Sequence, residues 1–257
     1  MKNPFEQHDV GHLSASSINE YITNPQRWLL HVSGYRDNIG IPAMWRGTAV
    51  DQAITKAIEL PTLSTQQIIR WAENCFDDLH NVQAEEKIFI DEEKARNEKI
   101  ALTKYLTPAI PHFRKLGKPI DSQKKIKLEL DDVDVPIIGY LDLLYDNCVR
   151  DIKTVNRLPS TMLDTVSRQL SIYGVAEQKK PIVDYVHATK TSSQVVVREV
   201  QHIDYHIKVV KKAAYNMGKI LSISNDIDEI ANLLIPDLDD WKWSNGERQA
   251  ARQLWRI

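Results

Sequence analysis

The stretch IIGYLDLLYDNCVRDIKTV, residues 137–155, decides the fold of this chain. Its two apolar runs are joined by Asp146 and Asn147, and both residue types tolerate the left-handed backbone angles that a two-residue turn requires. We therefore predict a β-hairpin whose strands are Ile137–Tyr145 and Cys148–Val155.

Two aspartates of this hairpin are predicted to face each other. Pairing Tyr145 with Cys148 across the turn places Asp142 directly opposite Asp151, with β-carbons about 5 Å apart. Like charges repel at this distance, and the apolar neighbours leave little water to relieve the repulsion, so a cation between them is favoured. Lys153 follows Asp151 on the same face, because strand side chains alternate. Two carboxylates beside a lysine are the parts of a metal-dependent phosphodiesterase.

Each of these residues also has a structural interpretation when it is taken alone. Asp142 can accept a hydrogen bond from a neighbouring backbone group, and Asp151 can lie at the edge of a turn. Lys153 can neutralise the aspartates as a salt bridge instead of acting on a substrate. Their combination on one hairpin favours the metal interpretation.

Composition bounds the class of protein. The chain has 257 residues, of which 42% are hydrophobic and 26% charged, and this is ample for a buried core. Its net charge of −2 excludes a bulk basic nucleic-acid binder but leaves room for a local basic groove. Cys75 and Cys148 are too few for a four-cysteine zinc or iron–sulfur site and suit a reducing cytosol. Met1–Val10 is polar and no apolar run could span a membrane, so we expect a cytoplasmic protein.

Hydrophobic periodicity predicts an α/β fold: a central mixed sheet flanked by helices, with extra helices at both ends. No internal repeat or linker divides the chain, so we expect one domain over residues 1–257, with helical additions at about 14–116 and 204–257. The predicted helices are 14–30, 47–60, 65–79, 84–106 (extended by 108–116 after a break), 161–178, 204–222, 226–234 and 246–257, and the further strands are 125–130, 182–188 and 194–200.

Several short motifs occur in a recognisable order, and together they resemble the PD-(D/E)XK nuclease superfamily, in particular its RecB-like exonuclease branch of phage and prokaryotic recombination proteins. Each motif is weak alone, but the ordered set spans Leu13 to Ala188. The resemblance implies a restriction-endonuclease-like core. The motifs are Leu13-Ser14-Ala15-Ser16-Ser17-Ile18-Asn19 with Asn24-Pro25, Gly47-Thr48-Ala49-Val50-Asp51, Gly139-Tyr140-Leu141-Asp142, Asp151-Ile152-Lys153-Thr154 and Gln169-Leu170-Ser171-Ile172-Tyr173.

The resemblance assigns roles to residues of the hairpin and the following helix. Asp142 and Asp151 match the metal-binding acids, and the carbonyl of Ile152 would be a further ligand. Lys153 matches the catalytic lysine. Gln169 and Tyr173, whose i, i+4 spacing places them on one helix face, match a motif that sets the active site and contacts DNA; Tyr173 could equally be a core residue.

Asp51 departs from the pattern, because the branch usually has histidine there. A carboxylate is a hard oxygen ligand that suits Mg²⁺ or Mn²⁺, so Asp51 is a metal-ligand candidate, with a solvated helix position as the alternative. Glu129 lies on the strand before the hairpin, where the family often has an acid. The alternative for Glu129 is an ion pair with a lysine.

These assignments predict a Mg²⁺- or Mn²⁺-dependent DNA exonuclease of recombination, repair or phage DNA processing. No Walker A motif is present, so the chain carries no helicase motor. Expected partners are DNA, a recombination protein such as a single-strand annealing protein, and a second copy of the chain, without a membrane. The alternatives are an endonuclease with the same site, or a catalytically weakened DNA-binding or assembly protein of the same fold.

Overall fold

A five-stranded mixed sheet forms the centre of the protein, which we describe from a computed structural model over residues 3–37, 40–85 and 89–257. Its strands lie in chain order, β1-β2-β3-β4-β5. All neighbours are antiparallel except β3 and β4, which run parallel. The bounds are β1 Asp121–Leu128, β2 Ile137–Leu144, β3 Cys148–Val155, β4 Lys180–Ala188 and β5 Ser193–Glu199.

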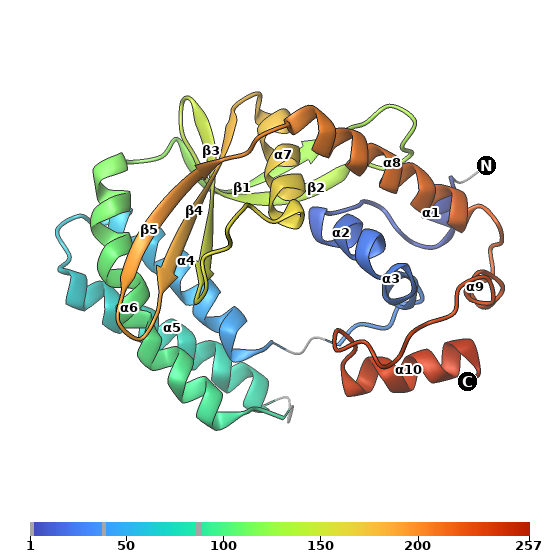
Figure 1. Ribbon diagram of the computed structural model, residues 1–257, viewed down its shortest axis with the longest axis horizontal. Helices are drawn as coiled ribbons and strands as arrows, with labels where there is room; N and C mark the ends of the chain where they lie inside the picture. Colours follow the sequence, from blue (N-terminus) through green and yellow to red (C-terminus); the bar gives the residue numbers. More distant parts are fainter. Residues whose placement is uncertain (1–2, 38–39, 86–88) are drawn as a thin grey trace.

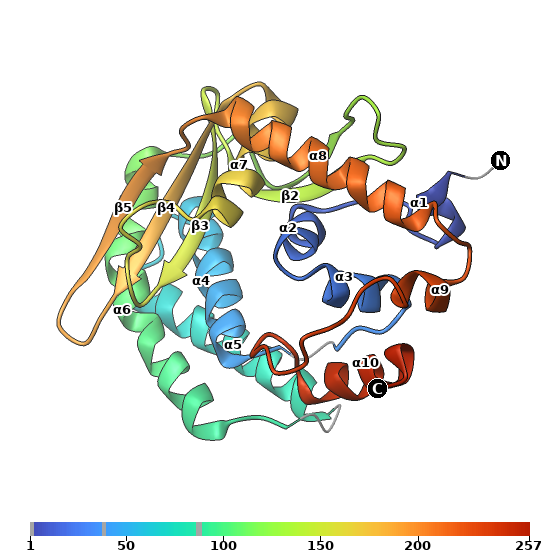
Figure 2. The ribbon, with the colours of Figure 1, turned by 45° about the vertical axis from the view of Figure 1, so that its right-hand side comes forward.

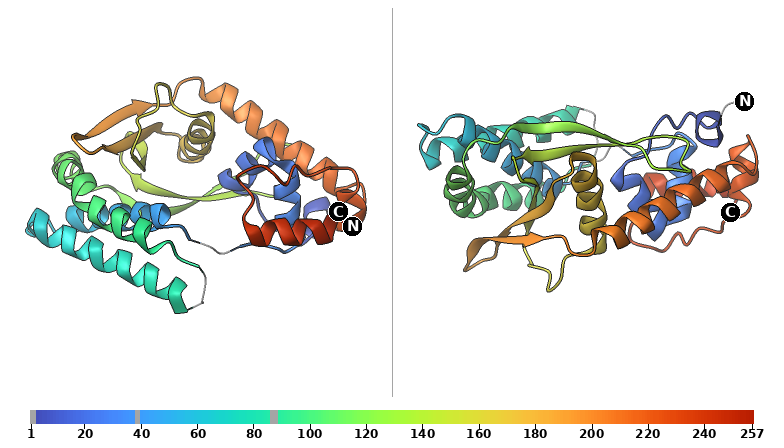
Figure 3. Two further views of the ribbon diagram at one scale, coloured as in Figure 1. Left: turned by 60° about the horizontal axis from the view of Figure 1, so that its bottom comes forward. Right: turned by 90° about the horizontal axis from the view of Figure 1, so that it is seen from above.

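Helices cover both faces of this sheet, which confirms the predicted α/β, restriction-endonuclease-like arrangement (Figures 1 and 3). The crossover helix α7, Asp164–Glu177, contacts β1, β3 and β4 on one face. On the other face lie α4 (Pro42–Glu59), α5 (Thr65–Glu85) and α6 (Glu92–Leu116). Each face therefore has its own apolar core.

The remaining helices gather at the end of the sheet away from α4–α6 (Figure 2). Here α8 packs against α7, α2 and α1, and α10 packs against α3 and α9. None of the described helices is long and apolar enough to cross a membrane. The bounds are α1 Pro4–Gln7, α2 Ala15–Thr23, α3 Pro25–Val32, α8 Ile203–Leu221, α9 Ile227–Ala231 and α10 Asn245–Trp255.

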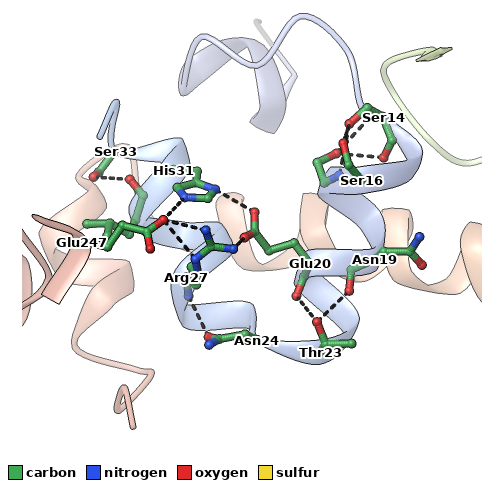
Figure 4. Close-up of polar contacts among 12 residues, drawn as sticks. Ser14, Ser16, Asn19, Glu20, Thr23, Asn24, Arg27, His31, Ser33 and Glu247 are labelled. Carbon is green, nitrogen blue, oxygen red and sulfur yellow. Dashed lines mark hydrogen bonds and ion pairs between the residues drawn. The ribbon is translucent and has the colours of Figure 1, made fainter. Parts of the chain in front are cut away.

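A partly buried polar network joins three of these helices, α2, α3 and α10 (Figure 4). Arg27 lies between two carboxylates and pairs with both. One belongs to Glu20 on α2, and the other to Glu247 on α10, whose Oε1 lies 2.7 Å from Nη2 of Arg27. His31 joins the same two acids, with Nδ1 2.7 Å from Glu20 and Nε2 3.0 Å from Glu247. Helices far apart in the sequence are thus held together by paired charges.

The central hairpin has the predicted register but is shorter than predicted. Leu143 pairs with Arg150, and the turn closes with the amide of Tyr145 donating to the carbonyl of Cys148 at 2.9 Å. The next position in this register is Asp142 opposite Asp151. The backbone pairing of the two strands stops just before it. The strands therefore part where the two aspartates lie.

Two predicted helix boundaries at the N-terminus are wrong. The helix predicted over 14–30 is two helices, because Pro25 has no N–H to continue α2, and Asn24 caps α3 by accepting from the amide of Arg27 at 2.9 Å. The α2 cap is Ser14, which exchanges bonds with Ser17. The described helix therefore begins at Ala15, one residue after the predicted start.

Other boundaries differ for reasons of packing. Helix α4 begins at Pro42, whose ring fits the first helical position. Of the predicted helix 84–106, Ala84 and Glu85 belong to α5, residues 86–88 lie outside the described part, and α6 starts at Glu92. It continues through Pro108 and Pro111. Burial of Leu106, Ala109, Ile110 and Phe113 offsets the lost backbone hydrogen bonds.

Candidate active site

Asp151 and Lys153 form the centre of the charged group on the hairpin. Asp151 is only 2% exposed, and the ammonium nitrogen of Lys153 lies 3.0 Å from Oδ1 and 2.8 Å from Oδ2. Burial raises the pKa of Asp151, against the effect of Lys153. Burial alone would lower the pKa of Lys153, but Asp151 and Asp142 raise it more, so its net shift is upward. Lys153 is therefore a charged ammonium held beside a buried acid.

Asp142 occupies the gap where β2 and β3 part. Its Oδ2 accepts the backbone N–H of Ile152 at 2.7 Å, so the side chain takes the place of a ladder bond. The backbone interaction expected from the structural interpretation is thus present. Even so, burial raises the pKa of Asp142 well above its usual range, and the charges of Asp151 and Asp51 raise it further. The hydrogen bond from Ile152 therefore does not compensate for the burial of this carboxylate and the repulsion from its acidic neighbours.

Asp51 joins this group from helix α4. The amide of Gln123 donates to its Oδ2 at 2.7 Å, whereas Oδ1 is buried and has no hydrogen-bond partner. Burial and the charge of Asp151 raise the pKa of Asp51 to about 6, against the effect of Lys153. The solvated-helix alternative for Asp51 therefore does not fit this position.

Gln123, not Glu129, is the β1 residue that reaches the site. Ser122 pairs with Leu143 and Lys124 with Leu141, so Gln123, which has a φ of 53°, lies opposite Asp142. Glu129 lies beyond the end of β1, about 20 Å farther along at the ordinary rise per residue. Its exposed carboxylate pairs with Lys127 at 2.6 Å, the alternative stated for this residue. Sequence analysis missed Gln123, because the strand that holds it was predicted to begin only at residue 125.

Gln169 and Tyr173 meet on one face of α7, as their spacing predicted. The amide of Gln169 donates to the hydroxyl of Tyr173 at 3.0 Å, and Tyr173 is buried. Burial raises the pKa of Tyr173; the bond from Gln169 opposes this, and Asp151 adds to it. A Cβ on Gly139 would lie 2.7 Å from the Tyr173 ring, so glycine is required there on β2.

A cavity of about 560 Å³ opens beside these residues. Lys153, Gln169 and Tyr173 line one part of it, and exposed Tyr140 on β2 lines another. The start of α2 closes the cavity with Ser14 and further residues up to Asn19. The cavity therefore leads to the lysine that neighbours Asp151.

The donor chemistry of the site fits a hard divalent cation. Asp51, Asp142 and Asp151 supply only oxygen donors, and Oδ1 of Asp51 is buried without a hydrogen bond, whereas both oxygens of Asp151 contact Lys153. Three acids face one lysine, and their pKa values are all raised. Among the described residues no group of three His, Cys, Asp or Glu side chains is already arranged to hold an ion. A bound cation would draw these carboxylates together.

The family model for the PD-(D/E)XK nuclease superfamily matches residues 12–246. The chain therefore belongs to this superfamily. Membership supports nuclease activity on DNA, and such nucleases generally use divalent metal ions. The search of curated proteins found no significant match.

Two of the solved structures that match the protein differ in how far the match extends. One bears the name "Putative exonuclease", from Eubacterium rectale; it is 14% identical, has a TM-score of 0.54, and the match covers 93% of this chain and 88% of that one. At this identity the likeness shows the fold alone. The structure of SSO0001 is 17% identical and has a TM-score of 0.28 over 36% of this chain and 48% of that one, which is too weak to indicate a shared fold.

Proposed function

We propose that this protein is a Mg²⁺- or Mn²⁺-dependent DNA exonuclease of the RecB-like branch. The observation that carries the proposal is the excess of acid at the hairpin: Asp51, Asp142 and Asp151 surround the single ammonium group of Lys153. Such an imbalance is costly in a folded protein unless a cation binds there.

The three aspartates would hold the metal, with the carbonyl of Ile152 as a further ligand. A bound divalent ion supplies an activated water and neutralises charge on the scissile phosphate. Lys153 orients the attacking water and offsets the negative charge that develops on the phosphate. Gln169 holds the Tyr173 hydroxyl at the wall of the substrate cavity. No covalent intermediate is needed.

Action from DNA ends is supported by the arrangement of helices around the site. Helices α4–α6 pack on one face of the sheet, and the group α1–α3 with α8–α10 lies at the end of the sheet away from them (Figure 2). Together they could form the walls of a channel that admits a terminus. The name of the Eubacterium rectale relative is in keeping with this. We place the enzyme in recombination, repair or phage DNA processing in the cytoplasm, as a single domain that acts with a partner such as a single-strand annealing protein or a second copy of the chain.

The test compares one DNA in covalently closed, nicked and linear forms. With Mg²⁺ present, the linear form should shorten progressively from its ends while the closed circle survives. EDTA should abolish digestion and added Mn²⁺ or Mg²⁺ should restore it. Rapid cutting of the closed circle into discrete fragments would favour the endonuclease alternative, and undiminished digestion in EDTA would overturn the metal mechanism.

A further inference from the structure

A second cavity, of about 610 Å³, lies where α7 and α8 begin and β5 ends. The first turn of α7 separates it from the active-site cavity: Thr165 and Val166 line the active-site side, while Asp164 and Ser167 line this one. The further polar lining residues are Ser160, Thr161, Arg198, Glu199, Gln201, His202 and His206. The role proposed for the hairpin leaves this cavity unexplained.

Two helices present uncapped N-termini to the cavity. The N-cap of α7 is Leu163, whose side chain cannot accept a hydrogen bond, and the N-cap of α8 is His202, whose side chain makes none. The N–H groups at the start of a helix attract anions, because they lack partners and lie at the positive end of the helix dipole. Two such ends at one cavity are a favourable setting for a phosphate.

Arg198 adds a cation without a counter-ion. Its guanidinium lies over the ring of Tyr185, 5.6 Å from the centroid, and forms no hydrogen bond or ion pair with any described residue. The atom Nη1 is buried and unpartnered. Arg150 is the contrasting case, because both oxygens of Asp184 lie 2.7 Å from its Nη1. Arg198 therefore carries a positive charge that the folded chain leaves unused.

His206 is an independent sign of a missing ligand. It is only 7% exposed, it lines the cavity, and its Nδ1 is buried without a partner. Buried polar atoms in native proteins normally have partners, so an unpartnered nitrogen calls for an explanation. Burial lowers the pKa of His206, so near pH 7 the neutral ring can offer one N–H to an acceptor.

The cavity also has two acids, and neither cancels these donors. Asp164 is exposed and pairs with Arg168 at 3.8 Å, and Glu199 is exposed and pairs with Lys180 at 3.8 Å. Each carboxylate thus has a cation of its own at the rim.

The sheet places Arg198 close to the site of the proposed reaction. Arg198 on β5 pairs with Val183 on β4, and Val183 pairs with Asp151 on β3. Direct partners point to the same side of a sheet, and neighbouring strands are about 4.8 Å apart, so the Cα atoms of Arg198 and Asp151 are about 10 Å apart on one face. A DNA strand that crosses the first turn of α7 could reach both cavities.

We propose that this cavity is a phosphate-binding subsite in which Arg198, His206 and the N-termini of α7 and α8 hold a backbone phosphate of the DNA strand that enters the active site. The assignment rests on the proposed function. Its role is to position the strand, so the subsite acts on binding and leaves the chemistry to the hairpin.

The test measures binding of a short labelled tailed duplex to the full-length protein in EDTA, by fluorescence anisotropy at several salt concentrations. We expect Arg198→Ala to weaken binding about tenfold and to reduce the slope of log K against log salt by about one. The matched control is Arg256→Ala at the end of α10, outside the cavity lining, which removes the same charge and should leave both values unchanged. Equal affinity and slope for Arg198→Ala and the parent would overturn the subsite.

A second variant guards against a loss of folding in Arg198→Ala. His202 is exposed and has a φ of 56°, a conformation that aspartate tolerates. In His202→Asp the new carboxylate faces both helix ends, so it should weaken DNA binding by repulsion without lowering thermal stability. Unchanged DNA binding by a folded His202→Asp protein would count against the subsite.

Inorganic phosphate and a deoxynucleoside monophosphate, titrated separately, distinguish the sources of the phosphate. If Arg198→Ala loses only these small ligands and binds DNA like the parent, the cavity is a product site and the proposal is wrong. Digestion by the parent with Mg²⁺ is scored separately. If Arg198→Ala loses DNA binding but the parent does not digest DNA, the subsite is kept and the nuclease mechanism is rejected. If the parent digests DNA but Arg198→Ala binds DNA as the parent does, the nuclease mechanism is kept and the subsite is rejected.

Discussion

Two clusters of acidic and basic side chains in this molecule differ in how their charges are balanced. At the helical end, Glu20 and Glu247 enclose Arg27 and His31, so two acids meet two bases. Burial alone would raise the pKa of Glu247, but its bonds to Arg27, Ser244 and His31 lower it below its usual range. This cluster is complete, and its role is to hold α2, α3 and α10 together.

The hairpin cluster has three acids and one base, and the pKa values of all three acids are raised. Each cluster has one buried acid, Glu247 or Asp151, among partly buried neighbours, so burial does not separate the two clusters. The difference lies in the missing positive charge. A cluster whose charges are all paired contributes to stability, whereas a cluster of acids that lacks a cation indicates a binding site.

The largest expected effect comes from Asp151→Asn. Losing this carboxylate should reduce DNA digestion by about a thousandfold, because the metal and Lys153 both depend on it. The metal-free protein should not become less stable, because one of three crowded acids is removed. Single-turnover digestion and thermal unfolding in EDTA check the two parts. A variant that digests DNA at the parental rate would show that Asp151 is only structural.

Lys153→Ala should also act mainly on turnover. We expect a loss of about a hundredfold in kcat with little change in DNA affinity, because the ammonium acts on developing charge. Lys127→Ala is a suitable control, since that lysine pairs with exposed Glu129 outside the site. Normal turnover in a folded Lys153→Ala protein would make Lys153 a salt-bridge residue.

Glu247→Ala tests the paired cluster at the helical end of the molecule. It leaves Arg27 and His31 short of one partner in a buried setting, so the free energy of unfolding should fall by about 3 kcal/mol. Urea unfolding measures this, with Glu229→Ala on the neighbouring helix α9 as a control. A change within the scatter of the control would mean that packing, and not the ion pairs, holds α10 in place.

The smallest effect concerns pH, and the contributions of Asp51 and Glu247 to stability respond to pH with opposite signs. Asp51 has a pKa of about 6 in the fold, above its unfolded value, so folding takes up a proton and the metal-free protein gains stability as pH falls from 7 through 6. Glu247 has a depressed pKa, so its contribution is present above its unfolded value and is lost as pH falls through the folded value.

Urea unfolding in EDTA between pH 7 and 5 should therefore show rising stability, and Asp51→Asn should flatten this rise. Saturating Mg²⁺ should remove it as well, because the bound ion keeps the carboxylates charged. Parallel pH profiles for the parent and Asp51→Asn would show that Asp51 does not take up the proton.

The sequence by itself determined those features that depend on neighbouring positions. The Asp146-Asn147 turn set the hairpin register, since a two-residue loop leaves one way to count back from Tyr145 to Asp142. The i, i+4 spacing of Gln169 and Tyr173 predicted their contact on α7, because helix geometry alone brings such positions together. The α/β order of elements followed from periodicity in the same way.

Tertiary structure decided what local pattern could not. Pro108 and Pro111 remain helical because α6 is buried against its neighbours. Asp142 takes the amide of Ile152 because the two strands part, and Asp51 reaches the hairpin because α4 packs beneath β3. Gln123 reaches the site and Glu129 does not, because of the register in which β1 pairs with β2. Each of these features depends on contacts between segments that are distant in the chain. The energies of such contacts cannot be read from the spacing of neighbouring residues.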